Sequence, residues 1–149
     1  MLKFKNGCLV KAAEEGEMDF LLHGCNCFST MGAGVAKSVS CVWPEASQVD
    51  KKDYRKPYER IGDYSYCRAD KLCIVNLYTQ YDFGIEYRRF EYGAFKRSLE
   101  SFCRDFRIVN KKIGLPWIGC GLAGGDKRIT QSILESVIDE YGGEWTIYE

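Results

Sequence analysis

Imidazole, thiol and amide side chains stand close together in one short segment of this chain. His23, Cys25 and Asn26 follow the apolar run Phe20–Leu22 and precede a glycine-rich turn. An imidazole titrates near neutral pH and can donate a proton to a leaving oxygen or act as a nucleophile. His23 is the only histidine in the sequence. The segment predicts a catalytic or ligand-binding site, and a structural histidine at a strand end is the alternative.

This segment has the order strand, glycine-rich loop, helix. Phe20–Leu22 is typical of the end of a buried strand, and Gly34–Lys37 of the start of a helix. Glycines let the backbone approach an anion closely, and free N–H groups at a helix start point toward it. The spacing is neither GxGxxG nor GxxxxGK[ST], so a Rossmann dinucleotide site and a P-loop are not supported. A loop that only turns the chain is the alternative to a phosphate site.

A second segment repeats the same order. Apolar residues from Ile113 lead into the small residues 119–125, and a helix is expected to begin near Asp126. Asp126 suits a helix N-cap, and it could equally act as a general base or orient a water or His23. Two such segments in one small domain predict two loops that hold one diphosphate.

The two segments resemble the ligand loops of macro domains, the ADP-ribose-binding family. The resemblance rests on His-x-Cys-Asn-Cys at 23–27 and Gly-Cys-Gly-Leu-Ala-Gly-Gly-Asp at 119–126, and it extends over nearly the whole chain. The closest likeness is to the branch, phage members included, that removes phosphate from ADP-ribose 1″-phosphate. The resemblance implies one macro domain over residues 1–149, a three-layer α/β/α fold with a mixed, mostly parallel sheet, a small-molecule substrate and no cofactor.

The resemblance also implies roles for individual residues. His23, together with Asp126 or Asp82, would assist hydrolysis at the 1″-phosphate. Asn26 would contact the distal ribose, and Tyr148 matches an aromatic position near the adenosine; a loop asparagine and a packing tyrosine are the alternatives. The diphosphate loops would be formed by Gly32, Ala33, Gly34 and Val35 in the first segment and by Gly119, Cys120, Gly121, Leu122 and Ala123 in the second.

Two positions depart from the family pattern. Macro domains usually carry Gly-Asp near the start, where the aspartate bonds the adenine amino group, whereas this chain has Gly7-Cys8. A thiol is a poor acceptor, so this change puts adenine selectivity in question. Relatives that release ADP-ribose from glutamate use a lysine after the middle strand. Residues 78–84 contain no lysine, which argues against a Schiff-base mechanism.

Two other functions would use the same loops. One is a hydrolase that removes ADP-ribose from protein or nucleic acid, which makes ADP-ribosylated macromolecules a further class of partner. The other is a binding module without catalysis. A third alternative is a redox or metal protein built on Cys25, Cys27 and Cys120. No CxxC pair supports a zinc site, so no metal is expected.

Composition and charge limit the remaining classes. The chain has 149 residues, of which 46% are apolar, enough for the core of one α/β domain. Lys and Arg number 21, as do Asp and Glu, so no basic surface indicates nucleic acid and a monomer is expected. No apolar run approaches the roughly 18 residues of a membrane span. Eight cysteines without an export signal predict a reducing, cytoplasmic location.

Hydrophobic periodicity predicts the elements that position these residues. Strands are expected at Leu2–Lys5, Met18–His23, Ile61–Cys67, Leu72–Tyr78, Ile108–Ile118 and Glu144–Tyr148. Helices are expected after Gly34 and at Pro44–Tyr54, Glu91–Phe106 and Asp126–Tyr141, with loops at Lys51–Arg60 and Thr79–Gly84. Ligands of such sheets bind beyond the carboxyl ends of the strands. Both glycine loops and the loop from Thr79 should therefore meet at one edge.

Overall fold

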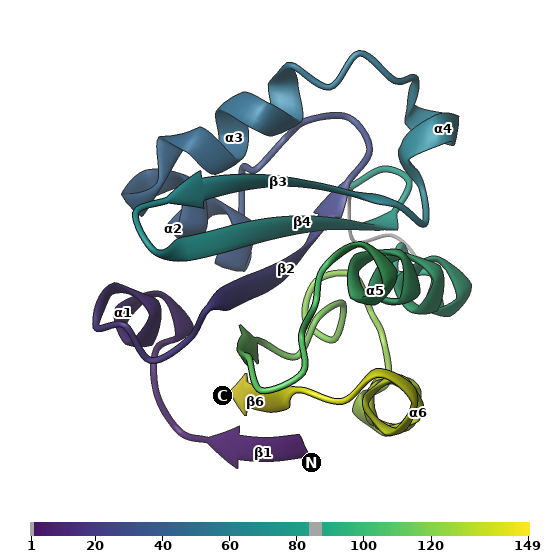
Figure 1. Cartoon of the computed structure of the whole chain (residues 1–149). Helices are drawn as coiled ribbons and strands as arrows, with labels where there is room; N and C mark the ends of the chain where they lie inside the picture. The colour runs from purple at the N-terminus through teal and green to yellow at the C-terminus, as the bar shows by residue number, and fades with distance from the viewer. Residues whose placement is uncertain (1, 84–87) are drawn as a thin grey trace.

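The computed structural model describes residues 2–83 and 88–149 and has a central sheet with helices on both sides (Figure 1). The strands are β1 (Leu2–Lys5), β2 (Phe20–Asn26), β3 (Tyr64–Ala69), β4 (Leu72–Gln80), β5 (Lys112–Leu115) and β6 (Glu144–Tyr148). The helices are α1 (Leu9–Glu14), α2 (Gly34–Val42), α3 (Pro44–Lys51), α4 (Pro57–Arg60), α5 (Tyr92–Asp105) and α6 (Lys127–Tyr141).

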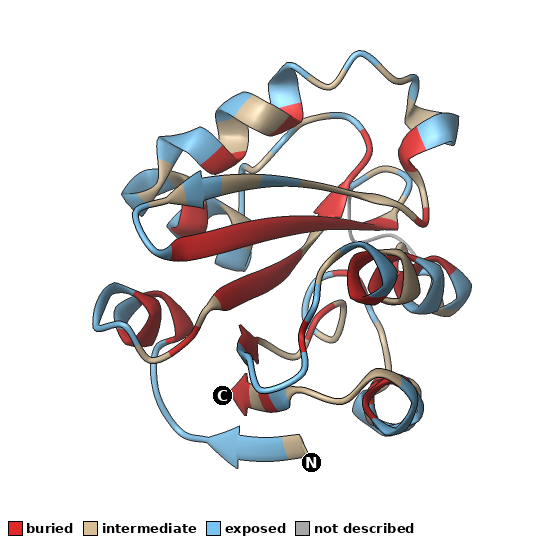
Figure 2. Ribbon diagram, viewed as in Figure 1, coloured by how far each residue is buried: buried red, intermediate tan, exposed pale blue. Residues whose placement is uncertain are grey.

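The six strands lie in the order β1-β6-β5-β2-β4-β3. Neighbouring strands are parallel throughout, except that β3 runs antiparallel to β4. The sheet is therefore mixed and mostly parallel, as the sequence predicts. β2 and β4 lie inside the sheet and are almost wholly buried, whereas the edge strand β1 is largely exposed (Figure 2).

Side-chain alternation along the central strands divides the core into two layers. Phe20 and Leu22 face a cluster formed with α5 and α6, while Leu21 faces a second cluster formed with α1, α2 and α3. In β4, Val75 and Leu77 face the first cluster and Ile74 the second. This alternation follows from the two-residue repeat of a strand. It also decides to which side of the sheet each residue at the ends of β2 and β4 points.

The expected helices at 91–106 and 126–141 are confirmed as α5 and α6, and Pro44 begins α3 as predicted. Two loop predictions are wrong in part, although residues 53–56 and 81–83 form neither helix nor strand. Thr79 and Gln80 are the last residues of β4, and Arg60 ends the short helix α4 with only 7% of its surface exposed. Arg60 is buried because its guanidinium donates to Ser29 and to the backbone carbonyls of Arg55 and Asp53. The strand expected at 108–118 is shorter, Lys112–Leu115, and Gly84 lies outside the described residues.

Across residues 2–83 and 88–149, every helix is too short or too polar to cross a bilayer.

Phe102 tests the packing between α5 and the sheet. Its ring is fully buried and meets Phe20 edge-on at a centroid distance of 5.2 Å. We expect Phe102→Ala to lower the free energy of unfolding by about 3–5 kcal/mol, because it leaves a cavity in the core. Tyr54→Ala is the control, since Tyr54 is 96% exposed. Urea denaturation of both variants measures the difference, and equal losses would contradict this packing.

Candidate functional site

A cavity of about 680 Å³ opens at the carboxyl ends of β2, β4 and β5. Its volume lies within the roughly 300–1,000 Å³ of small-molecule sites. The lining comes from four segments: Gly24, Cys25, Asn26, Thr30, Gly32, Ala33, Gly34, Val35 and Ala36; Thr79, Gln80 and Phe83; Pro116, Trp117, Ile118 and Gly119; and Gly121, Leu122 and Ala123. The two predicted glycine loops and the end of β4 therefore meet at one cavity.

Another hollow, of about 610 Å³, lies along α6. Its lining residues all belong to that single helix: Arg128, Gln131, Ser132, Glu135, Ser136 and Asp139. Ligand sites are usually formed where several elements converge. We therefore treat the cavity at the strand ends as the candidate site and this hollow as a surface depression.

The first loop brings the start of α2 to the cavity. Gly34 is the first residue of this helix, and the preceding Ala33 provides no side-chain cap. The first N–H groups of a helix have no carbonyl partner within the helix. Those of Gly34, Val35 and Ala36 also have no other acceptor in the described part of the chain. They are available to an anion in the cavity, and the helix dipole favours negative charge there.

The second loop offers further backbone donors. The N–H groups of Gly121, Leu122 and Ala123 donate no hydrogen bond within the described residues. The loop is closed beneath them by a hydrogen bond from Gly125 N to Gly119 O, 2.6 Å. Gly119 has a φ of +74°, and a Cβ there would overlap the buried ring of Phe90. Only glycine allows the chain to turn so close to that ring.

The cavity lining is electrically neutral among the described residues, since it contains no carboxylate, imidazole or basic side chain. Asn26 is 8% exposed, and its amide is used locally. Its Nδ2 donates to Thr30 O at 2.9 Å and its Oδ1 accepts from Phe28 N at 2.9 Å. Gln80 Nε2 donates to Asp82 O at 2.7 Å. Backbone N–H groups and neutral side chains are therefore the polar groups that face a ligand.

His23, expected to be catalytic, is not among the residues that line this cavity, and its catalytic role stays a prediction. The imidazole lies under α3 and is completely buried, because the alternation of β2 sends Gly24 toward the cavity and His23 to the opposite face. Its Nε2 is 2.6 Å from Asn76 Oδ1. Because Asn76 uses its own amide hydrogens toward Ala46 O and Ser65 Oγ, its oxygen accepts and His23 Nε2 donates. His23 is a neutral core residue.

Neither acid expected to assist catalysis is among the lining residues. Asp126 caps α6 by accepting a hydrogen bond from Arg128 N at 2.8 Å. Hydrogen bonding and charge pairing with the Arg128 guanidinium also lower the pKa of Asp126. Asp82 forms an ion pair with Arg89, 2.8 Å apart. Both carboxylates are turned toward arginines, and their catalytic role stays a prediction.

Two of the expected binding residues, Tyr148 and Cys120, are not among the lining residues, whereas Trp117, which was not expected, is. Tyr148 is buried in β6 beside Glu17, and Cys120 turns its thiol toward Ile118 O and Thr130. Trp117 lines the cavity, and its Nε1 donates to Glu149 at 2.7 Å. A tryptophan two residues before Gly119, where the second glycine loop begins, is the signal that could have indicated it.

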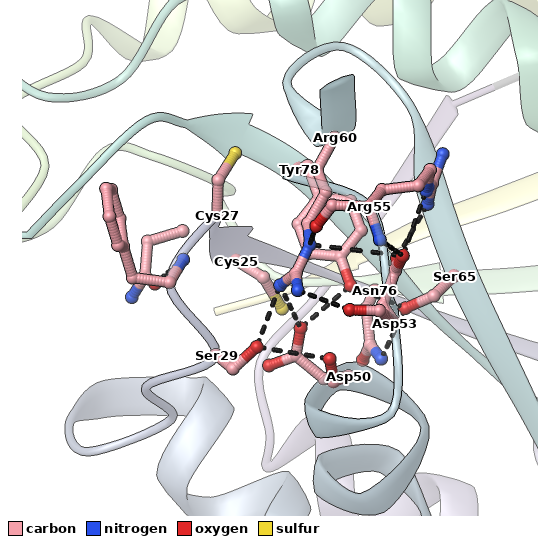
Figure 3. A network of polar contacts seen from close by, with 12 residues as sticks. Cys25, Cys27, Ser29, Asp50, Asp53, Arg55, Arg60, Ser65, Asn76 and Tyr78 are labelled. Carbon is pink, nitrogen blue, oxygen red and sulfur yellow. Dashed lines mark hydrogen bonds and ion pairs between the residues drawn. The ribbon is translucent and has the colours of Figure 1, made fainter. Parts of the chain in front are cut away.

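A buried polar network holds the first loop from behind (Figure 3). The Arg60 guanidinium donates to Ser29 Oγ at 2.8 Å and to Asp53 O at 2.6 Å, and lies 3.7 Å from Asp50. Asp50, 1% exposed, accepts a hydrogen bond from the Tyr78 hydroxyl at 2.7 Å. Burial raises the pKa of Asp50, while Tyr78 and Arg60 favour its charged form. Ser29 has a φ of +58°, so this network maintains an unusual backbone conformation.

The cysteines near the cavity are poor nucleophiles. Burial raises the pKa of Cys25 well above its usual range and that of Cys27 to about 12. Both are therefore thiols rather than thiolates at neutral pH. In the part of the chain that the structure describes, no three histidine, cysteine or acidic residues are grouped so that they could hold a metal ion.

Sequence comparison relates this chain to a phage protein. It is 32% identical to an uncharacterized 17.5 kDa protein from the tk-vs intergenic region of Enterobacteria phage T4, over 155 positions covering 99% of this chain and 94% of that protein. This chain belongs to the family of that phage protein. No family profile matches the chain.

Solved structures with the same arrangement include macrodomains. The macrodomain of Mycobacterium tuberculosis DarG has a TM-score of 0.77 at 19% identity, covering 99% of this chain and 97% of that one. The macrodomain of Thermus aquaticus DarG has a TM-score of 0.78 at 20% identity, covering 100% and 98%. Thermosipho africanus DarTG in complex with ADP-ribose has 0.73 at 15% identity, covering 98% of this chain and 41% of that one. This family member therefore has the macrodomain fold.

Arg60 tests the network behind the first loop. We expect Arg60→Met to lower the free energy of unfolding by about 3–5 kcal/mol, because it leaves the buried Asp50 carboxylate without its charge partner. Arg128→Met is the control: Arg128 also pairs with an aspartate, but its side chain is 92% exposed. The control should lose less than about 1 kcal/mol. Urea denaturation measures the free energy of unfolding of both variants. A loss in Arg60→Met as small as that in Arg128→Met would show that the Arg60 network contributes little to stability.

His23 gives a pH-dependent test of its core position. Burial lowers its pKa from 6.5 to about 4, and the hydrogen bond with Asn76 offsets only part of that shift. The unfolded chain therefore takes up a proton at a higher pH than the folded chain. The free energy of unfolding should therefore fall as the pH drops from about 6.5 to about 4, by about 1.4 kcal/mol per pH unit.

His23→Gln removes this titration and should show a shallower loss of stability between about pH 6.5 and about pH 4. Urea denaturation of the two proteins across this range measures the difference in slope. Parallel slopes would mean that the imidazole is accessible to protons in the folded protein, contrary to its burial.

Proposed function

We propose that this chain binds ADP-ribose in the cavity at the strand ends, with the diphosphate between the two glycine loops. The observation that carries this proposal is the set of free backbone N–H groups on both loops, Gly34–Ala36 and Gly121–Ala123, which line one cavity. Six N–H groups from two sides suit a group that carries several anionic oxygens. A protein of the same fold, Thermosipho africanus DarTG, has been solved in complex with ADP-ribose.

Backbone donors explain how an anion is held without a basic side chain in the described lining. N–H groups in a partly closed cavity act in a lower dielectric than water, so their dipoles interact strongly with negative charge. They are also fixed by the fold and lose little entropy on binding. The ligand's affinity should therefore depend on loop geometry more than on the protein's net charge.

Trp117 is the residue that we propose for the purine end of the ligand, in place of Tyr148. Its indole is fixed by Glu149 and by the ammonium group of Lys127, 5.2 Å from the ring centroid. An aromatic ring with restricted motion presents a stacking surface at low entropic cost. This contact does not require an acceptor at Cys8 for the adenine amino group.

Hydrolysis of ADP-ribose 1″-phosphate is the reaction that we propose for the same site. The resemblance of the first and second segments to the phosphatase-like branch supports it. The neutral lining limits how it would proceed. A water attacks phosphorus, the bond between phosphorus and the 1″ oxygen breaks, and a proton of the water passes to that oxygen. Neutral groups such as Asn26, Thr30 and Gln80 position the reactants. The same neutrality is the observation that favours a binding module as the second candidate.

Binding and turnover are separated by two assays on the same protein. Isothermal titration with ADP-ribose should show saturable binding, and incubation with ADP-ribose 1″-phosphate should release inorganic phosphate. Binding without phosphate release would reject the hydrolysis and favour the binding module. Release that persists in a variant unable to bind ADP-ribose would point to a different active site.

Val35 tests the position of the diphosphate. Val35 and Val42 lie on the same helix and are exposed to 38% and 39%, but only Val35 lines the cavity. Val35→Glu places a negative charge at the proposed phosphate site and should weaken ADP-ribose binding about tenfold or more. Val42→Glu should bind like the parent. Titration calorimetry measures both, and similar affinities for the two variants would contradict the proposed position.

A further inference from the structure

Thr79 has a buried hydroxyl without a partner at the floor of the cavity. Its side chain is completely buried and lines the cavity, and its Oγ1 has no hydrogen-bond partner in the described part of the chain. Buried hydroxyls in native proteins are nearly always paired, because leaving one unpaired costs free energy. This hydroxyl therefore needs an explanation beyond packing.

An irregularity in the sheet puts Thr79 in this place. Cys25 of β2 lies opposite Tyr78 of β4, but the next residue, Asn26, lies opposite Gln80. Thr79 is therefore the extra residue of a β-bulge. Bulges re-aim side chains and are common beside functional sites. Here the backbone carbonyl of Thr79 accepts a hydrogen bond from Glu91 N at 2.9 Å. The hydroxyl of Thr79 is left without a partner among the described residues.

The position of this hydroxyl depends on Gly24, because Thr79 Oγ1 packs where a Cβ at position 24 would lie. A Cβ at position 24 would come within 2.9 Å of Thr79 Oγ1 and 2.8 Å of Ile118 Cγ2. Any side chain at position 24 would therefore collide with both neighbours. The hydroxyl, Gly24 and Ile118 lie together at the base of the cavity, and Ile118 leads directly into the second glycine loop. Thr79 and the residues of both glycine loops line the same cavity.

We propose that the Thr79 hydroxyl donates a hydrogen bond to a diphosphate oxygen of the bound ligand, between the donors of the two loops. This rests on the proposed binding of ADP-ribose in the same cavity. A hydroxyl rotates to suit its acceptor, and a bond to a charged oxygen is stronger than one to a neutral group. Thr79 is then a ligand-binding residue, and the unpaired hydroxyl of the free protein is the consequence.

Removal of the Thr79 hydroxyl should weaken ADP-ribose binding without lowering the stability of the free protein. Thr79→Val keeps the shape of the side chain and removes the hydroxyl. It should leave the thermal midpoint of the free protein equal or higher, because no hydrogen bond is lost, and it should weaken ADP-ribose binding about tenfold. Thr79→Ser keeps the hydroxyl and should bind ADP-ribose within about threefold of the parent. A hydroxyl with a structural role would instead lower the midpoint when removed.

Thr146→Val controls for the exchange itself, since Thr146 is on β6 and lines a different, small hollow. It should bind ADP-ribose like the parent. Calorimetry and thermal unfolding on all four proteins give the test. Equal affinity of Thr79→Val and the parent, or a lower midpoint of the free Thr79→Val protein, overturns the role of Thr79 and leaves the binding proposal intact. A parent chain that does not bind ADP-ribose overturns both.

Discussion

The side-chain alternation at the end of β2 determines the rest of the site. Gly24 lines the cavity, and the absence of a Cβ there lets the side chains of Thr79 and Ile118 pack close to the strand. His23, one residue earlier, faces the opposite layer and bonds to Asn76 under α3. Because successive residues of a strand point to opposite faces, both placements follow from one register with β4. A shift of one residue would fill the cavity with imidazole and open a void beneath α3.

A site of this kind depends on the precision of its backbone. The donors are N–H groups at the start of α2 and in the loop 121–123, and neither set can be moved by a rotamer change. The supporting contacts are correspondingly rigid: the Arg60 network holds the first loop, and Gly119 lies against Phe90 beneath the second. The buried charges of Arg60 and Asp50 thus lie behind the cavity and position the first loop, while the described cavity lining is neutral.

Sequence reasoning reached those features that depend on local pattern. The two glycine loops, α5 and α6 are visible in composition and periodicity, and the sheet class follows from their order. Features that depend on contacts between distant segments could not be predicted from the sequence. β2 is apolar on both faces, so its pattern does not tell which face receives His23. Arg60 lies in a charged stretch without periodicity, and the bulge at Thr79 arises only from pairing with β2. Trp117, two residues before Gly119, can be located from the sequence alone.

The central claim is that backbone N–H groups of both loops bind one diphosphate. Amide chemical shifts of the ¹⁵N-labelled chain during an ADP-ribose titration test it most directly. We predict that the largest changes fall on Gly34–Ala36 and Gly121–Ala123 together, with the same saturation curve. Unchanged amides in both loops, or changes concentrated on the exposed face of α6, would contradict this account.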